Sequence, residues 1–316
     1  MNVENNREIK YGLINENGET VGFVYHGDRI VKGKSPNEDA KEFIEFKRYI
    51  HHNKFCINSI QQLTNENLSG AEYKVFWFLS EHVRYDNNKV TFDNGEALTV
   101  DNISVPSLSN NVLGKSAIYN ALRKLIKKEI VFKVNGTDNN IEYFLNPYVI
   151  MKGNYVSKQS KSMFEKSKWC KKREVETNTI GKGNNFNKFW SSAIQELSNE
   201  NLSSTDYKIF WTLAGRLRYS TNLVSFVNGK PMTVKGMMRV SNGKLKESSI
   251  YSALSILEKK EMIKKIKLGR TIEYYMNPYI TIKGSKISMK THELFENSKW
   301  YELFKAGEEL ANEIRD

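Results

Sequence analysis

The chain carries one domain-sized segment twice. From Asn53 to Val100, 25 of 48 positions are identical to those from Asn187 to Val234 at a constant offset of 134 residues. The offset then falls to 132 and to 131, and both copies close on a similar sequence, MFEKSKW at 163–169 and LFENSKW at 294–300. A period of about 130 residues is far longer than a solenoid unit, so the repeat predicts two copies of a whole fold. The offset changes where loops are expected, because loops tolerate changes in length.

The repeat divides the chain into five segments. These are an N-terminal β-hairpin plus helix at 1–52, the first copy at 53–169, a linker at 170–186, the second copy at 187–300, and an acidic C-terminal helix or tail at 301–316. The hairpin is expected within 10–34, where Glu-Asn-Gly lies between β-prone runs. The helix is expected over 36–51, which begins with proline and is acidic in its first turns.

Both copies show the same order of predicted elements. A helix capped at Ser69 or Ser203 carries aromatic residues on its apolar stripe, and these are expected in a core. An Asn-Gly hairpin, a short helix (101–107 and 235–240), a polar turn and a long amphipathic helix follow. A last hairpin ends at Asn-Pro. This order predicts an α+β, mainly helical fold: two tandem winged helix-turn-helix domains preceded by a small β-hairpin and helix.

The positive charge is spread unevenly along the chain. The net charge of +12 divides into −1 for 1–52, +4 for 53–169, +2 for 170–186, +10 for 187–300 and −3 for 301–316. A basic surface of this kind suits a polyanionic partner. A lysine-rich solvated surface explains the charge alone equally well, so charge does not decide between these two interpretations.

The long amphipathic helix of each copy is the predicted DNA-reading element. A recognition helix lies in the major groove with its N-terminal residues toward the base edges. The candidates away from the buried stripe are Lys115, Ser116, Tyr119, Asn120 and Arg123 in the first copy, and Lys244, Lys246, Ser248, Ser249, Tyr251 and Ser252 in the second. Asn can pair with adenine and Arg with guanine, whereas Ser, Tyr and Lys more often contact phosphate.

The last hairpin of each copy is the predicted wing. In the second copy its candidate DNA contacts are Lys264, Lys265, Lys267 and Arg270. In the first copy they are Lys133, Asn135 and Thr137, beside the acidic Asp138. We therefore expect the second copy to supply more of the electrostatic affinity for double-stranded DNA. A winged helix used only for protein contacts is the alternative.

Other chemistry finds little support in the sequence. The five histidines show no metal or catalytic spacing, and neither a phosphate-binding P-loop nor a nucleophile elbow is present. We therefore expect no enzyme activity and no cofactor. Cys56 and Cys170 are expected to be thiols in a reducing compartment. The polar N-terminal sequence and the lack of about 20 consecutive apolar residues predict a cytoplasmic protein, associated with nucleoid or plasmid DNA and not with a membrane.

Several of these segments resemble the RepL family of plasmid replication proteins from Firmicutes. GLINENGETV at 12–21 is similar to the start of that family's N-terminal hairpin. SSIYSALSILEKKEMIKK at 248–265, followed by YYMNPYITIKG at 274–284, is similar to its recognition helix, wing and exit. The resemblance implies a plasmid or phage replication or maintenance protein that binds its own origin. The duplication departs from the family, and MarR-like regulators share the winged helix.

Three functions stay open on the sequence. The first is replication initiation or maintenance at origin repeats, and the second is transcriptional regulation of phage or plasmid genes. The third is a partition or scaffold adaptor in which one copy binds protein. Host replication or transcription proteins are the further partners expected, and the sequence leaves homodimer formation open. Because the two predicted recognition helices differ, their half-sites are expected to differ as well.

Overall fold

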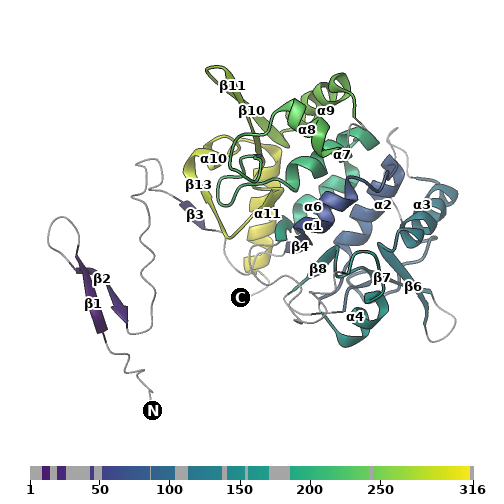
Figure 1. Cartoon of the computed structure of the whole chain (residues 1–316). Helices are drawn as coiled ribbons and strands as arrows, with labels where there is room; N and C mark the ends of the chain where they lie inside the picture. Colours follow the sequence, from purple (N-terminus) through teal and green to yellow (C-terminus); the bar gives the residue numbers. More distant parts are fainter. Residues whose placement is uncertain are drawn as a thin grey trace, which may run out of the picture. The chain divides into compact units, whose positions relative to one another are not determined.

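The computed structural model describes residues 9–14, 20–25, 43–45, 52–85, 87–103, 113–136, 141–153, 156–170, 186–241 and 245–313. The chain forms two compact units, Met1–Glu42 and Phe43–Asp316. Both copies of the repeat therefore lie within one unit, with a mixed α and β architecture (Figure 1).

The N-terminal unit contains the hairpin expected within 10–34. Strand β1 (Ile9–Ile14) pairs antiparallel with β2 (Thr20–Tyr25). The helix predicted over 36–51 is wrong at 43–45, which form strand β3 (Phe43–Glu45) of the second unit. This strand pairs with β13 (Lys286–Ser288), and Ile44 packs against the core. Pairing with a strand distant in sequence overrides the local helical pattern here, and the rest of 36–51 lies outside the described residues.

The described residues of the first copy form a series of strands and helices. They are β4 (His52–Cys56), α1 (Ile57–Leu63), α2 (Gly70–Glu81), β5 (Lys89–Val90), α3 (Lys115–Lys127), β6 (Val131–Asn135) and β7 (Ile141–Leu145). Strand β8 (Ile150–Lys152) and helix α4 (Lys158–Phe164) follow. Strands β5, β7 and β6 form an antiparallel sheet in that order.

The second copy has a similar order, with α8 in addition and with isolated β-bridges at Val224 and Leu223 in place of a strand matching β5. Its elements are β9 (Phe186–Trp190), α6 (Ser191–Asn199), α7 (Ser204–Ala214), α8 (Val234–Val240), α9 (Glu247–Lys259), β10 (Ile263–Leu268), β11 (Thr271–Met276) and β12 (Thr281–Ile282). After β13 come α10 (Met289–Glu293) and α11 (Lys299–Glu313). Helix α8 matches the short helix predicted at 235–240, whereas residues 104–107 of its predicted counterpart lie outside the described residues.

Local sequence explains several of these element ends. Ser203 and Asp206 form a reciprocal capping box at the start of α7, and Ser69 accepts a hydrogen bond from the backbone N–H of Glu72 at the start of α2. The predicted Asn-Gly hairpins are tight turns, each closed by a single β-bridge. Gly95 and Gly229 adopt positive φ there, at 84° and 78°.

A single four-stranded sheet joins the two copies, in the order β12-β9-β4-β8. Strands β4 and β9 pair antiparallel with Lys54 opposite Lys188, which are equivalent positions of the repeat. Phe55 lies opposite Asn187, and Asn53 lies opposite Phe189, so the pairing is reciprocal. The two copies therefore meet as the subunits of a twofold-symmetric dimer do, but within one chain.

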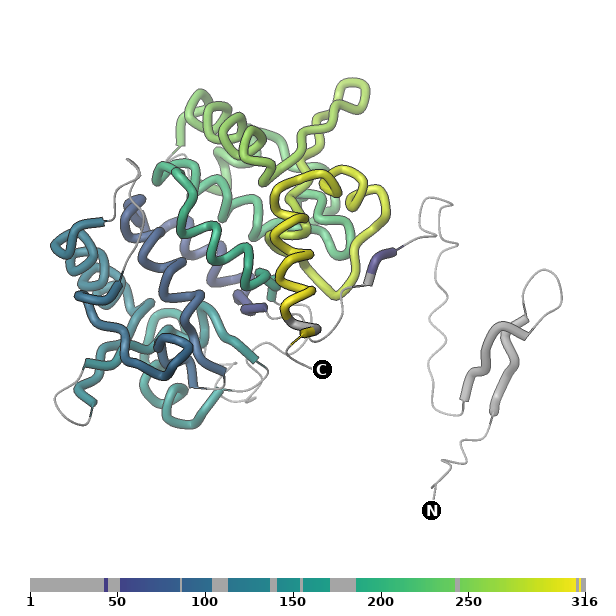
Figure 2. The backbone as a smooth tube through the Cα atoms, turned by 180° about the vertical axis from the view of Figure 1, so that it is seen from behind, coloured from purple at the N-terminus to yellow at the C-terminus, as the bar shows by residue number. Residues whose placement is uncertain are grey.

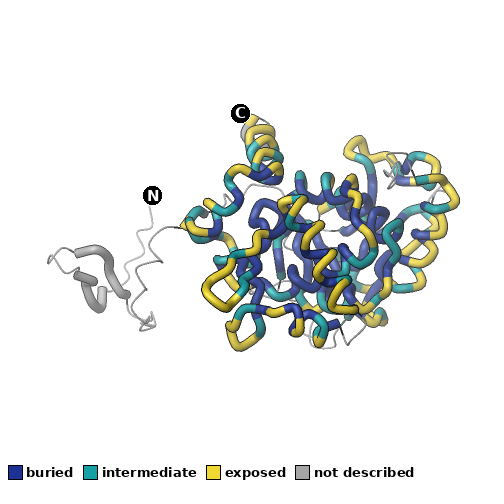
Figure 3. Tube along the Cα trace, turned by 90° about the horizontal axis from the view of Figure 1, so that it is seen from above, coloured by how far each residue is buried: buried dark blue, intermediate teal, exposed yellow. Residues whose placement is uncertain are grey.

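The shared core consists of equivalent aromatic residues packed against each other. The rings of Trp77 and Trp211 stack with centroids 4.9 Å apart and planes 6° from parallel. Phe55 and Phe189 lie 4.6 Å apart, and the fully buried Tyr73 and Tyr207 stack at 4.8 Å. The aromatics expected to be core residues are thus buried, and many of them contact the other copy. Figure 3 shows the buried residues gathered in the interior of this unit.

The closing sequence of each copy holds the end of the preceding long helix. Trp169 Nε1 donates to the carbonyl of Lys128, and Trp300 Nε1 donates to the carbonyl of Lys260, each at 2.8 Å. The serine two residues earlier accepts a hydrogen bond from the asparagine of Asn-Pro: Ser167 from Asn146 at 3.1 Å, and Ser298 from Asn277 at 3.0 Å. The repeated Ser-Lys-Trp therefore has a structural role in both copies.

Candidate nucleic-acid interface

Helix α3 presents its predicted DNA-contacting residues to solvent. Ile118, Leu122 and Leu125 form its buried stripe. The sequence candidates on the other side are all exposed, and they are Lys115, Ser116, Tyr119, Asn120 and Arg123. Tyr119 is 58% exposed although it is a large aromatic residue. An exposed, polar helix face with one aromatic side chain is suited to contact a groove and its phosphates.

Helix α9 repeats this arrangement in the second copy. Lys246 is its N-cap residue, Ser248, Tyr251 and Ser252 are exposed, and Ser249 is half-buried. Tyr251 is 50% exposed and is the equivalent of Tyr119. Lys244 lies outside the described residues.

The hairpin β10–β11 exposes all four of its basic candidates. Lys264, Lys265 and Lys267 are exposed on β10, and Arg270 is exposed in the turn. Leu268 pairs with Thr271, so the two turn residues are Gly269 and Arg270. Gly269 has φ of +58°, a conformation that favours glycine.

The hairpin β6–β7 is less basic. Lys133 and Asn135 are exposed on β6, and Thr137 and Asp138 lie outside the described residues. Figures 1 and 2 show the two hairpins extending from separate parts of the unit.

In each copy the long helix packs against the first strand of the hairpin that follows it, α3 against β6 and α9 against β10. Tyr251 of α9 lies near Tyr274 of β11, and Tyr119 of α3 lies near Tyr143 of β7. Burial raises the pKa of Tyr274 and of Tyr143, and the neighbouring tyrosine adds to each rise. Helix and hairpin thus adjoin in both copies, and their exposed residues can contact one partner together.

The exposed faces of α3 and α9 differ in charge. Aligned along the helices, α3 has Lys115, Asn120, Arg123 and Lys124 where α9 has Glu247, Ser252, Ser255 and Ile256. The first copy therefore places basic residues on its long helix, and the second places them mainly on other elements. Lys115 pairs with Asp101 at 2.6 Å, but both side chains are more than two-thirds exposed, so solvent weakens this pair and a phosphate can replace it.

The second copy has further exposed cations that the sequence interpretation missed. Lys230 is exposed in the Asn-Gly turn, and Lys235 and Arg239 are exposed on α8. The guanidinium of Arg239 lies over the ring of Phe226, 5.9 Å from its centroid. Helical periodicity could have identified Lys235 and Arg239, because residues four apart share a helix face.

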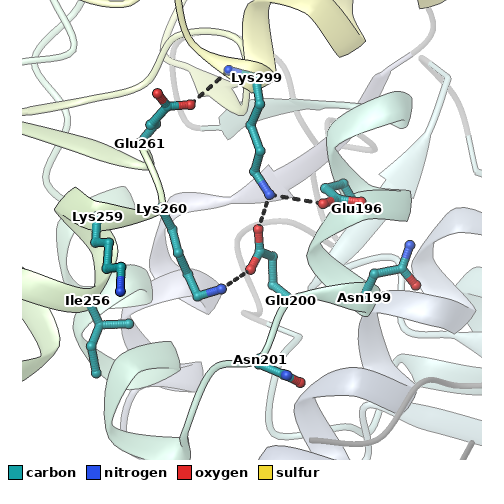
Figure 4. A pocket seen from close by; sticks show the side chains of 9 residues that line it. All are labelled: Glu196, Asn199, Glu200, Asn201, Ile256, Lys259, Lys260, Glu261 and Lys299. Atoms are coloured by element: carbon teal, nitrogen blue, oxygen red, sulfur yellow. Dashed lines mark hydrogen bonds and ion pairs between the residues drawn. The ribbon is translucent and has the colours of Figure 1, made fainter. Parts of the chain in front are cut away.

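A charged hollow of about 610 Å³ lies between α6, α9 and the start of α11 (Figure 4). Its charges pair with each other: Lys260 and Lys299 both contact Glu200, and Lys299 Nζ also lies 2.9 Å from Glu196. Burial lowers the pKa of Lys299, but hydrogen bonds to the two glutamates outweigh it and raise that pKa above its ordinary value. These charged groups are paired with each other. Their ion pairs therefore link the C-terminal ends of α6 and α9 to the start of α11.

Three further observations bear on the class of protein. Within the described residues, no group of three or more His, Cys, Asp or Glu side chains could hold a metal ion. Among the helices so described, none has the length and apolar character needed to cross a membrane. Comparisons with protein-family models, curated proteins and solved structures gave no match.

Proposed function

We propose that the chain is a sequence-specific double-stranded-DNA-binding protein with two fused winged helix-turn-helix units. The single observation that carries this proposal is the exposed polar face of α3 and α9, each adjoining a β-hairpin. The hairpin β10–β11 has four exposed basic residues, and β6–β7 has Lys133. The order helix, strand, helix, helix, hairpin in the second copy supports the winged-helix assignment: α7, a β-bridge at Leu223, α8, α9 and β10–β11.

The biological role that we propose is replication initiation or maintenance at a plasmid or phage origin. This role rests on the resemblance of the N-terminal hairpin, α9 and β10–β11 to the RepL family. Regulation of transcription would use the same surfaces. Selection of bound sequences from a random DNA pool, followed by footprinting on the replicon that encodes the protein, separates the two. Sites inside the origin support initiation, and sites found only at other promoters contradict it.

The hairpin β10–β11 provides the first prediction. Replacing Lys264, Lys265, Lys267 and Arg270 by serine should weaken DNA binding at low salt. Each phosphate contact contributes about −0.9 to the slope of log K against log salt concentration, so loss of all four should make the slope shallower by up to about 3.6. Fluorescence anisotropy at several salt concentrations measures this slope.

The control neutralises two lysines that are not among the predicted DNA contacts. Lys158 of α4 and Lys166, just after it, are exposed and are suitable for replacement by serine. Their loss should change the slope by less than the loss of Lys264 and Lys265 alone, which removes the same number of charges. An unchanged DNA affinity in the hairpin variant would instead favour the adaptor function, in which this copy binds protein.

A further inference from the structure

The reciprocal contact between the two copies constrains the DNA site that one chain can bind. Resting on the proposed function, we infer that a single chain binds a complete inverted repeat with two unequal half-sites, in one orientation. No second chain is needed to complete this site.

Reciprocal contacts establish the symmetry relation. Lys74 Nζ donates to Asn201 Oδ1 at 3.5 Å, and the equivalent Lys208 Nζ donates to Asn67 Oδ1 at 3.1 Å. Lys54 pairs with its own equivalent, Lys188, in the central sheet, and Trp77 stacks on its own equivalent, Trp211. A residue can meet its own equivalent only close to a twofold axis, so an approximate twofold axis passes through this core.

The same axis relates the two candidate DNA-reading helices. Helix α2 packs on α3, and α7 packs on α9, so each long helix is fixed to the shared core by an equivalent contact. Rotation by half a turn about an axis perpendicular to the DNA reverses the direction of a helix along the DNA. Two readers related in this way match half-sites that are inverted, whereas readers related by translation match direct repeats.

The symmetric contact is already occupied inside the chain. Phe55, Trp77, Phe189 and Trp211 are each no more than 1% exposed. A one-copy protein would have to bury this face by forming a homodimer, and here the second copy buries it. One chain therefore supplies both reading helices.

The differences between the helices give the complex a direction. Position by position, the exposed residues Lys115, Asn120, Arg123 and Lys124 correspond to Glu247, Ser252, Ser255 and Ile256. Arg and Asn can make bidentate contacts to guanine and adenine, and Ser cannot make a contact of that strength. The half-site under α3 is therefore the one defined more strongly by base contacts, and the half-site under α9 depends more on phosphate contacts from β10.

The test gives α9 the exposed residues of α3 at the four positions where they differ in this comparison. The variant carries Glu247→Lys, Ser252→Asn, Ser255→Arg and Ile256→Lys in the full chain. All four positions are exposed, so the fold should tolerate the changes, and circular dichroism checks it. The reverse variant, Asn120→Ser with Arg123→Ser, is the second measurement. Bound sequences are selected from a random duplex pool with the native chain and both variants.

The native chain should select two different half-sites in inverted orientation. The first variant should select a closer palindrome built from the α3 half-site, and should prefer it over the native site by about tenfold or more. The reverse variant should lose base preference in one half-site only. Sedimentation with a selected duplex should give one chain per site.

Other results separate the two proposals. Half-sites in direct orientation, two chains per site, or an unchanged selection by both variants would overturn this inference while leaving DNA binding intact. Failure of the native chain to enrich any duplex would overturn the proposed function and this inference with it.

Discussion

Tyr73 and Tyr207 are equivalent residues that stack on each other, yet their hydroxyl groups are bonded differently. Tyr207 Oη donates to the carbonyl of Leu197 at 3.1 Å. Among the described residues, the buried hydroxyl of Tyr73 has no hydrogen-bond partner. Leaving a buried polar group unpaired is unfavourable, whereas a typical hydrogen bond stabilises by about 1 kcal/mol.

The two Phe substitutions should therefore differ in effect. Tyr207→Phe should lower the free energy of unfolding by about 1 kcal/mol, because it removes a bonded hydroxyl. Tyr73→Phe should leave stability unchanged or increase it, because it removes an unbonded one. Urea unfolding at pH 8 measures both, and equal losses for the two variants would contradict the assigned hydrogen bonds.

The burial of Tyr73 and Tyr207 also predicts that the folded chain loses stability at alkaline pH. Burial raises the pKa of both tyrosines above the ordinary value of about 10. In the unfolded chain they ionise from about pH 10, while in the folded chain they stay protonated, so the unfolded state binds fewer protons there. Stability from these groups is full below about pH 10 and falls as pH rises above it. Tyr73→Phe should make this fall less steep in urea unfolding between about pH 9 and 11, and an unchanged slope would contradict the shift.

At the level of elements, α9 is fixed at its C-terminal end by Trp300. This side chain is fully buried, and its Nε1 donates to the carbonyl of Lys260. Trp300→Phe should destabilise the chain by about 1 kcal/mol through the lost hydrogen bond and contacts. Trp300→Ala should cost about 3–5 kcal/mol because it leaves a cavity. Urea unfolding measures both, and Trp169→Phe in the first copy is the matched comparison.

Elements with a strong local pattern could be predicted from the sequence. The apolar stripe of α3 and the Asn-Pro at the end of the β6–β7 hairpin set those elements by spacing alone. Strand β3 could not be predicted, because its partner β13 lies more than 200 residues away in the sequence. The exposed helix residues followed from the same periodicity, whereas the pairing of β4 with β9 depends on non-local contacts that no local pattern reports.

On the scale of the whole molecule, the shared core makes the two copies depend on each other. Segmenting the sequence at 170–186 gives two domains, but Phe43–Asp316 is one compact unit with equivalent aromatic residues packed across it. Each copy alone would expose a face containing Trp77 and Phe55, or Trp211 and Phe189. Exposing several large aromatic side chains is unfavourable by about 2 kcal/mol or more for each.

A chain divided between the copies should therefore behave differently from two independent domains. Fragments 43–170 and 186–316 purified separately should each self-associate, because the exposed face is complementary to its own copy as well as to the other. Mixed after denaturation, they should form a one-to-one complex that unfolds in a single transition. Light scattering with size exclusion gives the stoichiometry. Two stable monomeric fragments that do not bind each other would show that the central sheet and the stacked tryptophans do not hold the copies together. The approximate twofold relation of α3 and α9 would then lose its physical basis.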